Sequence, residues 1–137
     1  MNFLPTLLRV STLSEGEFSL ILLRCNFEEV RQSIVEELAQ ISAINIQSLA
    51  LPSTVNTLFT AIKEQLGNEK PQALMVCGLE SVQDIDIVLT TANQVREEFR
   101  KQFPFPVFLW VNDLIVRKFV RLSPDLENWA SIIEIKN

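Results

Sequence analysis

Residues 18–25 (FSLILLRC) form a near-continuous apolar run, which is typical of a strand that is buried on both faces of a parallel sheet. The hydrophobic periodicity changes directly after this strand. Apolar residues at helical spacing predict an amphipathic helix over residues 27–41. Asn26 fits the N-cap of this helix, and Glu29 three residues later completes a capping box. A buried strand that leads directly into a helix predicts a sheet covered by helices.

The same alternation continues to the end of the chain. Apolar segments bounded by turn residues predict strands at residues 18–25, 44–51, 73–77, 107–111 and 132–135. Helices are expected at 27–41, from Ser53 or Thr54 to Leu66, at 82–102 and from 112 or 113 to 122, with one further turn at 127–130. We therefore predict an α/β fold with three αβα layers, a five-stranded parallel sheet and right-handed crossovers. Residues 1–137 would form one domain, with residues 1–17 as an irregular or short helical lead-in.

The junction after the first strand lacks the residues of a phosphate-binding loop. Such a loop reads G-x-x-x-x-G-K-[ST], because glycines let backbone N–H groups surround phosphate and the lysine supplies positive charge. Here the junction contains neither glycine nor lysine, and Glu28 and Glu29 begin the helix. The plan of the chain is that of a nucleotide-binding domain, whereas the usual binding residues are missing.

Ligands of doubly wound sheets bind beyond the carboxyl ends of the strands, where three polar residues of this chain are candidates. Glu80 follows an apolar strand and would hold Mg²⁺ or orient water, or it is a solvated residue near a helix start. Asn112, with Asp113, would sense a phosphate or simply cap the next helix. The backbone amides at Asn26 are the third candidate.

Two basic clusters are expected on helix surfaces. They form either a partner surface, including a nucleic-acid contact, or a solvated face with intrahelical ion pairs, and they comprise Arg96, Arg100, Lys101, Arg117, Lys118 and Arg121. The aromatic segment 103–110 (FPFPVFLW) is expected to be core rather than a stacking platform. Trp129 is expected to cover an end of the sheet rather than to bind a ligand.

Composition excludes several classes of function. The chain has no histidine, which removes most Ser-His-Asp, Cys-His and zinc-hydrolase mechanisms. Cys25 and Cys77 lack metal-binding spacing and are expected to be buried reduced thiols, which suits the cytoplasm, with a disulfide or a reactive thiol as the alternative. A net charge of −5 disfavours a nucleic-acid groove. No apolar stretch reaches the roughly 18 residues that a membrane span needs, so a soluble protein is expected. Without histidine and without metal-binding cysteine spacing, no metal or cofactor is expected.

The segment 93–113 (NQVREEFRKQFPFPVFLWVND), together with 122–129 (LSPDLENW) and 73–82 (ALMVCGLESV), resembles a domain near the start of large, chiefly cyanobacterial, multidomain proteins that carry tetratricopeptide repeats. The strand–helix plan is similar to the P-loop core of STAND-type signalling NTPases. That resemblance implies the strand order 5-1-4-3-2, with Glu80 at the Walker B position and Asn112 near the first sensor. The chain departs from this pattern over residues 25–31, where the Walker A residues are absent.

The expected function is that of a non-catalytic, degenerate NTPase-like module for protein interaction or assembly in a larger signalling or scaffold protein. Its partner would be another protein or a neighbouring domain of a longer parent chain. Assembly into a homo-oligomer is a further alternative. The first alternative is a nucleotide-binding switch without a standard Walker A loop. A weaker alternative is nucleic-acid contact through the basic helix faces.

Overall fold

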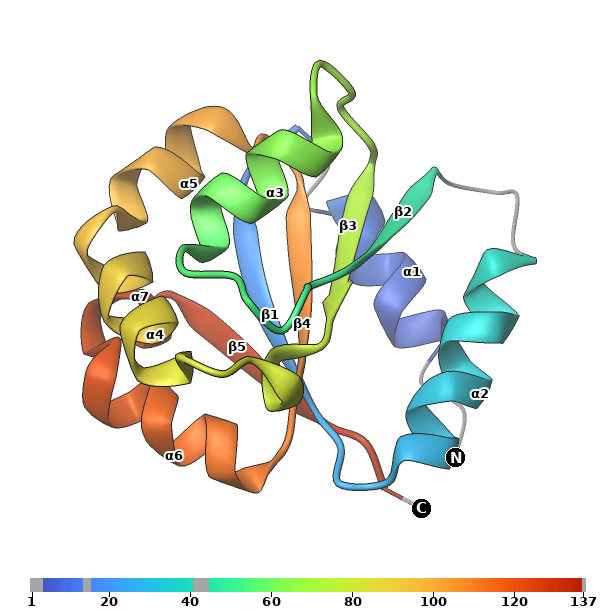
Figure 1. Ribbon diagram of the computed structural model, residues 1–137. Coiled ribbons are helices and arrows are strands. Elements are labelled where there is room, and N and C mark those ends of the chain that lie inside the picture. The colour runs from blue at the N-terminus through green and yellow to red at the C-terminus, as the bar shows by residue number, and fades with distance from the viewer. Residues whose placement is uncertain (1–3, 14–15, 41–44, 137) are drawn as a thin grey trace.

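The fold is a five-stranded parallel sheet between two layers of helices, as the computed structural model of the chain shows (Figure 1). The structure describes residues 4–13, 16–40 and 45–136. The strand order is β2-β3-β4-β1-β5, which is the predicted order 5-1-4-3-2 read from the other edge. The strands are β1 (Ser19–Arg24), β2 (Ile46–Ala50), β3 (Ala73–Cys77), β4 (Pro106–Val111) and β5 (Ala130–Glu134). The predicted α/β fold class is therefore confirmed.

Two strongly buried strands, β1 and β4, lie next to each other in the interior of the sheet. Every residue of β4 is buried, and so are the middle four residues of β1. The two strands pair in parallel, with Leu22 opposite Leu109. A central strand faces helices on both sides, so both sets of alternating side chains must be apolar. The edge strand β5 has no such requirement, and Ile132 at its middle is 44% exposed.

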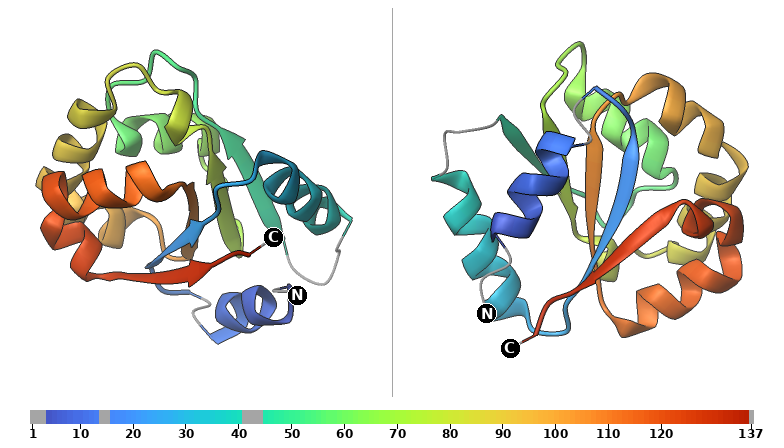
Figure 2. Two further views of the ribbon diagram at one scale, coloured as in Figure 1. Left: turned by 90° about the horizontal axis from the view of Figure 1, so that it is seen from below. Right: turned by 180° about the vertical axis from the view of Figure 1, so that it is seen from behind.

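Alternate side chains of β1 point into two separate cores. Leu20 and Leu22 belong to the larger core, whereas Ile21 and Leu23 belong to the smaller one. The smaller core is covered by α1 (Leu4–Leu13) and α2 (Glu28–Ala39) (Figure 2). The larger core is covered by α3 (Leu58–Leu66), α4 (Ile85–Gln94), α5 (Arg96–Gln102), α6 (Asp113–Leu122) and α7 (Pro124–Asn128).

The aromatic segment 103–110 is part of the core, as predicted. Phe103, Phe105, Phe108 and Trp110 are at most 3% exposed. Phe103 also contacts the ring of Phe99 in an edge-on arrangement, with 5.7 Å between the ring centres. Phe103 and Phe105 lie in the larger core, whereas Phe108 and Trp110 lie in the smaller core on the other face of the sheet. All four side chains are buried, so they form no exposed platform for stacking with a ligand.

The predicted single helix over 82–102 is two helices separated at Val95. Val95 has φ −108° and ψ 22°, outside the helical region. The break coincides with long-range contacts of Asn93, whose Oδ1 accepts hydrogen bonds from the N–H groups of Asp125 (2.9 Å) and Leu126 (3.0 Å) at the start of α7. The guanidinium of Arg96 donates to the Asn93 carbonyl at 2.7 Å. The contacts of Asn93 with α7 depend on the tertiary fold, and helical periodicity could not reveal them.

Several predicted boundaries are also wrong. The second helix begins at Leu58 rather than at Ser53 or Thr54, because a turn at Pro52 holds this segment and the Ser53 carbonyl accepts from the distant Gln83 N–H at 2.9 Å. Of the two forms predicted for the lead-in, the short helical one is confirmed over Leu4–Leu13, since α1 buries Leu7 completely. Helix α7 starts at Pro124, and β5 begins at residue 130 rather than 132. The predicted helix end at 41 and strand start at 44 lie outside the described residues.

Gly78 lets the chain turn out of β3 beside the backbone of Leu51. It has φ +105°, a left-handed conformation that side chains rarely adopt. A Cβ at this position would lie 3.0 Å from the Leu51 carbonyl oxygen and 3.2 Å from its nitrogen. The obstacle is backbone that is itself hydrogen-bonded to Cys77, so it cannot move aside.

We predict that Gly78→Ala destabilises the protein by about 2–4 kcal/mol, from backbone strain plus the clash with Leu51. Gly67→Ala is the matched control, because Gly67 also has positive φ (+58°) but open space around its added Cβ. The control should cost only about 1 kcal/mol. Urea unfolding of the three proteins measures both values, and equal losses would show that the contact with Leu51 is unimportant.

Candidate functional site

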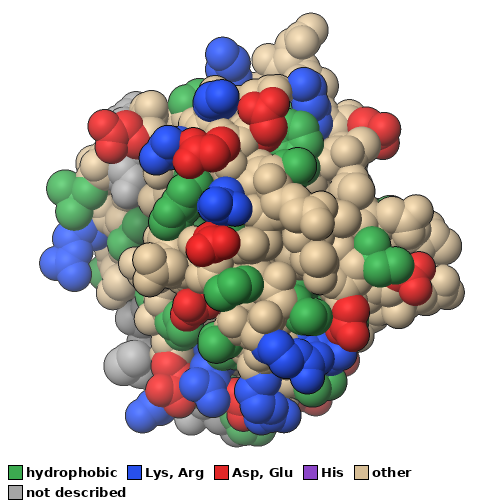
Figure 3. Space-filling view, turned by 90° about the vertical axis from the view of Figure 1, so that its left-hand side faces the viewer, with side chains coloured by type: hydrophobic (Ala, Val, Ile, Leu, Met, Phe, Trp, Pro, Cys, Tyr) green, Lys and Arg blue, Asp and Glu red, His purple; other side chains and the backbone are tan. Residues whose placement is uncertain are grey.

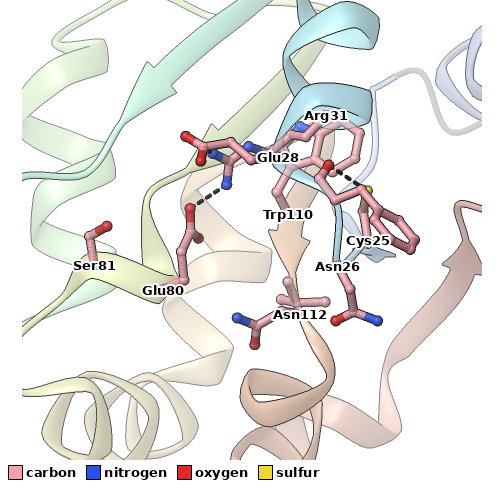
Figure 4. A pocket seen from close by; sticks show the side chains of 10 residues that line it. Cys25, Asn26, Glu28, Arg31, Glu80, Ser81, Trp110 and Asn112 are labelled. Atoms are coloured by element: carbon pink, nitrogen blue, oxygen red, sulfur yellow. Dashed lines mark hydrogen bonds and ion pairs between the residues drawn. The ribbon is translucent and has the colours of Figure 1, made fainter. Parts of the chain in front are cut away.

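A pocket of about 170 Å³ lies at the carboxyl ends of β1 and β4 (Figure 4). After β1 the chain continues into α2 on one face of the sheet, and after β4 it continues into α6 on the other face. Such a switch point is where doubly wound sheets bind ligands. The residues around this pocket include Cys25, Asn26, Phe27, Arg31, Glu80 and Asn112. The structure thus brings the three candidates Asn26, Glu80 and Asn112 to one pocket.

Asn26 connects the starts of the two helices that flank the pocket. It lies in the connection 25–27 between β1 and α2, and its Oδ1 accepts a hydrogen bond of 2.9 Å from the backbone N–H of Asp113 in α6. The prediction that Asn26 caps α2 is wrong, because the N-cap residue is Phe27 and no side chain caps this helix. The short connection instead places the Asn26 amide across the switch point.

Asn112 caps the helix that follows β4. Its Oδ1 accepts a hydrogen bond of 2.9 Å from the backbone N–H of Ile115 in the first turn of α6. Of the two functions that the sequence leaves open for Asn112, the capping one is therefore confirmed. A part in phosphate sensing stays a prediction.

Glu80 forms an ion pair across the pocket with Arg31 of α2 (Figure 4). Glu80 lies on the short 3-10 helix η1 (Leu79–Ser81), which follows β3 and Gly78. The side chains of Arg31 and Glu80 are 19% and 29% exposed, and Glu28 lies 3.5 Å from the same guanidinium. The carboxylate that the sequence offers to Mg²⁺ or water is thus already bound to a cation of the chain.

Arg31 is the functional candidate that sequence reasoning missed. It is the only basic residue between Arg24 and Lys63, and this isolation was the available signal. It lies one turn into α2, so the guanidinium can reach past the helix start to η1. Its partner is 49 positions away in the chain, a separation that no local pattern reports.

A second ion pair lies beside the pocket, between Arg24 at the end of β1 and Asp113 at the start of α6. The Arg24 Nε and Asp113 Oδ1 atoms are 2.6 Å apart, and both side chains are 40% exposed. The hydrogen bond from Arg24, followed by one from Asn26, lowers the pKa of Asp113 below its ordinary value. Asp113 is therefore ionised at neutral pH and serves as an anchor rather than as a proton donor.

The two cysteines near the pocket are free thiols, as predicted, but they are half-buried rather than buried. The Cys25 thiol donates to the Phe27 carbonyl at 3.3 Å, and the Cys77 thiol to the Leu49 carbonyl at 3.6 Å. Burial raises the pKa of Cys77, so this thiol stays protonated at neutral pH and is a poor nucleophile. Among the described residues, no group of three or more acidic or cysteine side chains could hold a metal ion.

The two predicted basic clusters lie at different ends of one helical face. Figure 1 places α5 and α6 at opposite ends of this face, and Figure 3 shows acidic side chains between the basic groups. Some of these cations are paired at the surface, in the pairs Arg96–Asp125 (3.7 Å), Arg100–Glu97 (2.5 Å) and Lys118–Asp86 (2.6 Å). Acidic side chains and ion pairs therefore interrupt the two basic clusters.

Trp129 packs against the larger core and is half-buried. The guanidinium of Arg100 lies over its ring, 5.2 Å from the ring centre. Since Trp129 immediately precedes β5, it lies at the amino-terminal edge of the sheet, opposite the pocket. This position supports its expected part as a cover over the end of the sheet.

Comparison with protein-family models finds no match for this chain, and no curated protein matches it significantly. Within the described residues, none of the helices has the length and apolar character required to traverse a lipid bilayer.

We predict that Arg24→Gln raises the pKa of Asp113 toward the ordinary value of an aspartate, and that Asn26→Ala raises it less. A lowered native pKa contributes stability above the unfolded-state pKa, and this contribution disappears as the pH falls through the native value. The acid side of the stability profile should therefore be less steep in Arg24→Gln. NMR titration of the Asp113 carboxyl carbon measures the shift, and an unchanged pKa would show that the ion pair is absent in solution.

A double-mutant cycle of Arg31→Gln and Glu80→Gln should give a coupling free energy of about 1 kcal/mol, since both side chains are mostly shielded from water. The pair Arg100–Glu97 is a matched control, because its side chains are 61% and 50% exposed. Its coupling should be only about 0.3 kcal/mol. Chemical denaturation measures both cycles. Equal couplings would mean that the Arg31–Glu80 pair is an ordinary surface contact.

Proposed function

We propose that this chain is a non-catalytic, NTPase-like α/β domain that serves protein interaction or assembly. The observation that carries the proposal is the Arg31–Glu80 ion pair. In a phosphate-binding site, cations and backbone N–H groups are directed at the ligand. Here the cation at the switch point is neutralised by a carboxylate of the same chain, so the pocket offers little net attraction to an anion.

The start of α2 gives further support. Glu28 and Glu29 occupy its first turn, where their charges interact favourably with the helix dipole. A phosphate at the same place would meet two negative charges. The connection 25–27 is also too short to surround a phosphate with backbone amides, and it contains no glycine.

The size of the pocket leads to the same conclusion. Sites for drug-sized ligands usually enclose about 300–1,000 Å³, whereas this pocket has about 170 Å³. The volume suits a small ion or a few water molecules better than a whole nucleotide. An adaptor domain needs no such site, because it acts through its outer surfaces.

The proposed setting follows from the resemblance of the sequence to amino-terminal domains of cyanobacterial multidomain proteins. In this setting the domain is a degenerate relative of STAND-type NTPases, joined to further modules of a signalling or scaffold protein. A cytoplasmic location fits its two free cysteines. The partner is then another protein or a neighbouring domain.

A second candidate function is a nucleotide-binding switch. It is favoured by one observation, namely that Asn26, Glu80 and Asn112 line the same pocket. For this function the Arg31–Glu80 pair would have to open, releasing Arg31 for a phosphate and Glu80 for Mg²⁺. The amide oxygens of Asn26 and Asn112 already accept backbone hydrogen bonds, and the Asn26 side chain also hydrogen-bonds the Asp113 carboxylate, so few of these polar atoms are left for a ligand.

We predict that ATP, ADP and GTP with Mg²⁺ leave the melting temperature unchanged within about 1 °C, because a ligand stabilises a protein only if it binds the native state. Thermal-shift titrations of the purified chain measure this, with Mg²⁺ alone as the control. A saturable shift of several degrees would contradict the proposal. In that event the titration would be repeated with Glu80→Ala, to separate binding in this pocket from binding elsewhere on the protein. Loss of the shift would identify the pocket as the nucleotide site.

A further inference from the structure

Helix α6 has an outer face that the rest of the fold leaves uncovered. Its inner side chains Ile115 and Phe119 are buried against the larger core. On the outer side, Leu114 and Val120 are each 51% exposed. The exposed residues of α6 are Leu114, Arg117, Val120 and Arg121. Aliphatic and cationic side chains therefore alternate along one solvent-facing strip.

The two arginines of this strip form no direct ion pair among the described residues, although Arg117 interacts electrostatically with Asp113. Across the described ranges, neither Arg117 nor Arg121 is within ion-pair distance of a carboxylate, although the protein as a whole carries a net charge of −5. The two arginines are four residues apart on one helix, and like charges at this spacing destabilise a helix. This local excess of positive charge favours contact with an acidic partner.

The neighbouring helix α4 extends the same surface. Asp86 forms an ion pair with Lys118 at 2.6 Å, which fixes α4 beside α6. Next to it, Ile87 is 52% exposed and borders a shallow depression of about 220 Å³ that Thr90 and Thr91 also line. Figure 3 shows basic side chains gathered at the lower end of this face, where α6 lies in Figure 1, with hydrophobic side chains among them.

We propose that this α4–α6 surface, formed by Ile87, Leu114, Arg117, Lys118, Val120 and Arg121, binds an acidic amphipathic helix of a protein partner. The inference rests on the proposed function as an interaction module and specifies its binding face. Aliphatic side chains of the partner helix would cover Ile87, Leu114 and Val120, and its carboxylates would pair with Arg117 and Arg121. The partner helix would be recognised through its apolar face, with charge complementarity fixing its orientation.

The aliphatic residues favour a protein partner over other polyanions. A nucleic-acid backbone would place hydrated phosphates against Leu114 and Val120, which offer phosphate no hydrogen bond. An anionic membrane could cover the aliphatic residues, but its extended surface would also meet the overall negative charge of the protein. A helix contacts only the strip itself, and charges beyond about 8 Å are screened at physiological salt.

The probe for the test is a synthetic helical peptide about five turns long, with leucine along one face and glutamate elsewhere. The control peptide has the same composition in scrambled order, so that it lacks an apolar face. Backbone NMR shifts of the full chain should change on α4 and α6 with the first peptide and not with the scrambled one. Fluorescence anisotropy of the labelled peptide gives the dissociation constant.

Paired variants separate specific contacts from net charge. Arg117→Glu with Arg121→Glu should weaken binding at least about tenfold, and Leu114→Gln with Val120→Gln should do likewise. Lys70→Glu with Lys101→Glu changes the net charge by the same amount at two exposed sites elsewhere, and it should alter the dissociation constant less than about twofold. Circular dichroism and melting temperature verify that each variant is folded.

Four outcomes would overturn the inference. In the first, the two charge-reversed pairs weaken binding equally, and in the second, the scrambled peptide binds as tightly as the first peptide. In the third, the NMR shifts are confined to other elements. In the fourth, the peptide is displaced by a single-stranded oligonucleotide, by anionic vesicles or by self-association of the protein, which sedimentation detects. The nucleotide titration is independent of these results, because it probes the pocket beside Arg31. Failure of the surface and failure of the proposed function are thus distinguishable.

Discussion

The burial of β1 and β4 at the centre of the sheet determines the rest of this structure. Both strands are apolar on both faces, so helices must cover both sides. The chain leaves β1 toward one side and β4 toward the other, and the pocket lies where the two paths diverge. Polar side chains at this point join the two layers, through the Asn26–Asp113 hydrogen bond and the Arg24–Asp113 pair.

The fold was predictable because its determinants are local and repeated. Apolar runs identified the strands, helical periodicity identified the helices between them, and alternation implied a parallel sheet with two helical layers. The strand order came from the resemblance to STAND-type NTPases, and the register pairs of β1 with β4 and β5 agree with it. The break at Val95 was not predictable, since it accompanies contacts of Asn93 with a helix that begins 31 positions after it.

The position of the candidate site was predictable, whereas the contacts that its residues form were not. Parallel strands end at one edge, so Asn26, Glu80 and Asn112 were expected to lie close together, and all three line the pocket. Their partners were hidden, because Asn26 binds Asp113 and Glu80 binds Arg31 across long sequence separations. A capping pattern read from neighbours alone therefore assigned Asn26 to the wrong helix.

The shortness of the connection 25–27 has an evolutionary consequence. A phosphate loop needs extra residues between strand and helix, and point substitution cannot supply length. An insertion at this position would separate Asn26 from Asp113 and carry Arg31 away from Glu80, so the first step toward such a loop would loosen both helical layers at once. Descendants of this domain can readily vary their outer surfaces, whereas lengthening this connection into a phosphate loop would require several coordinated changes.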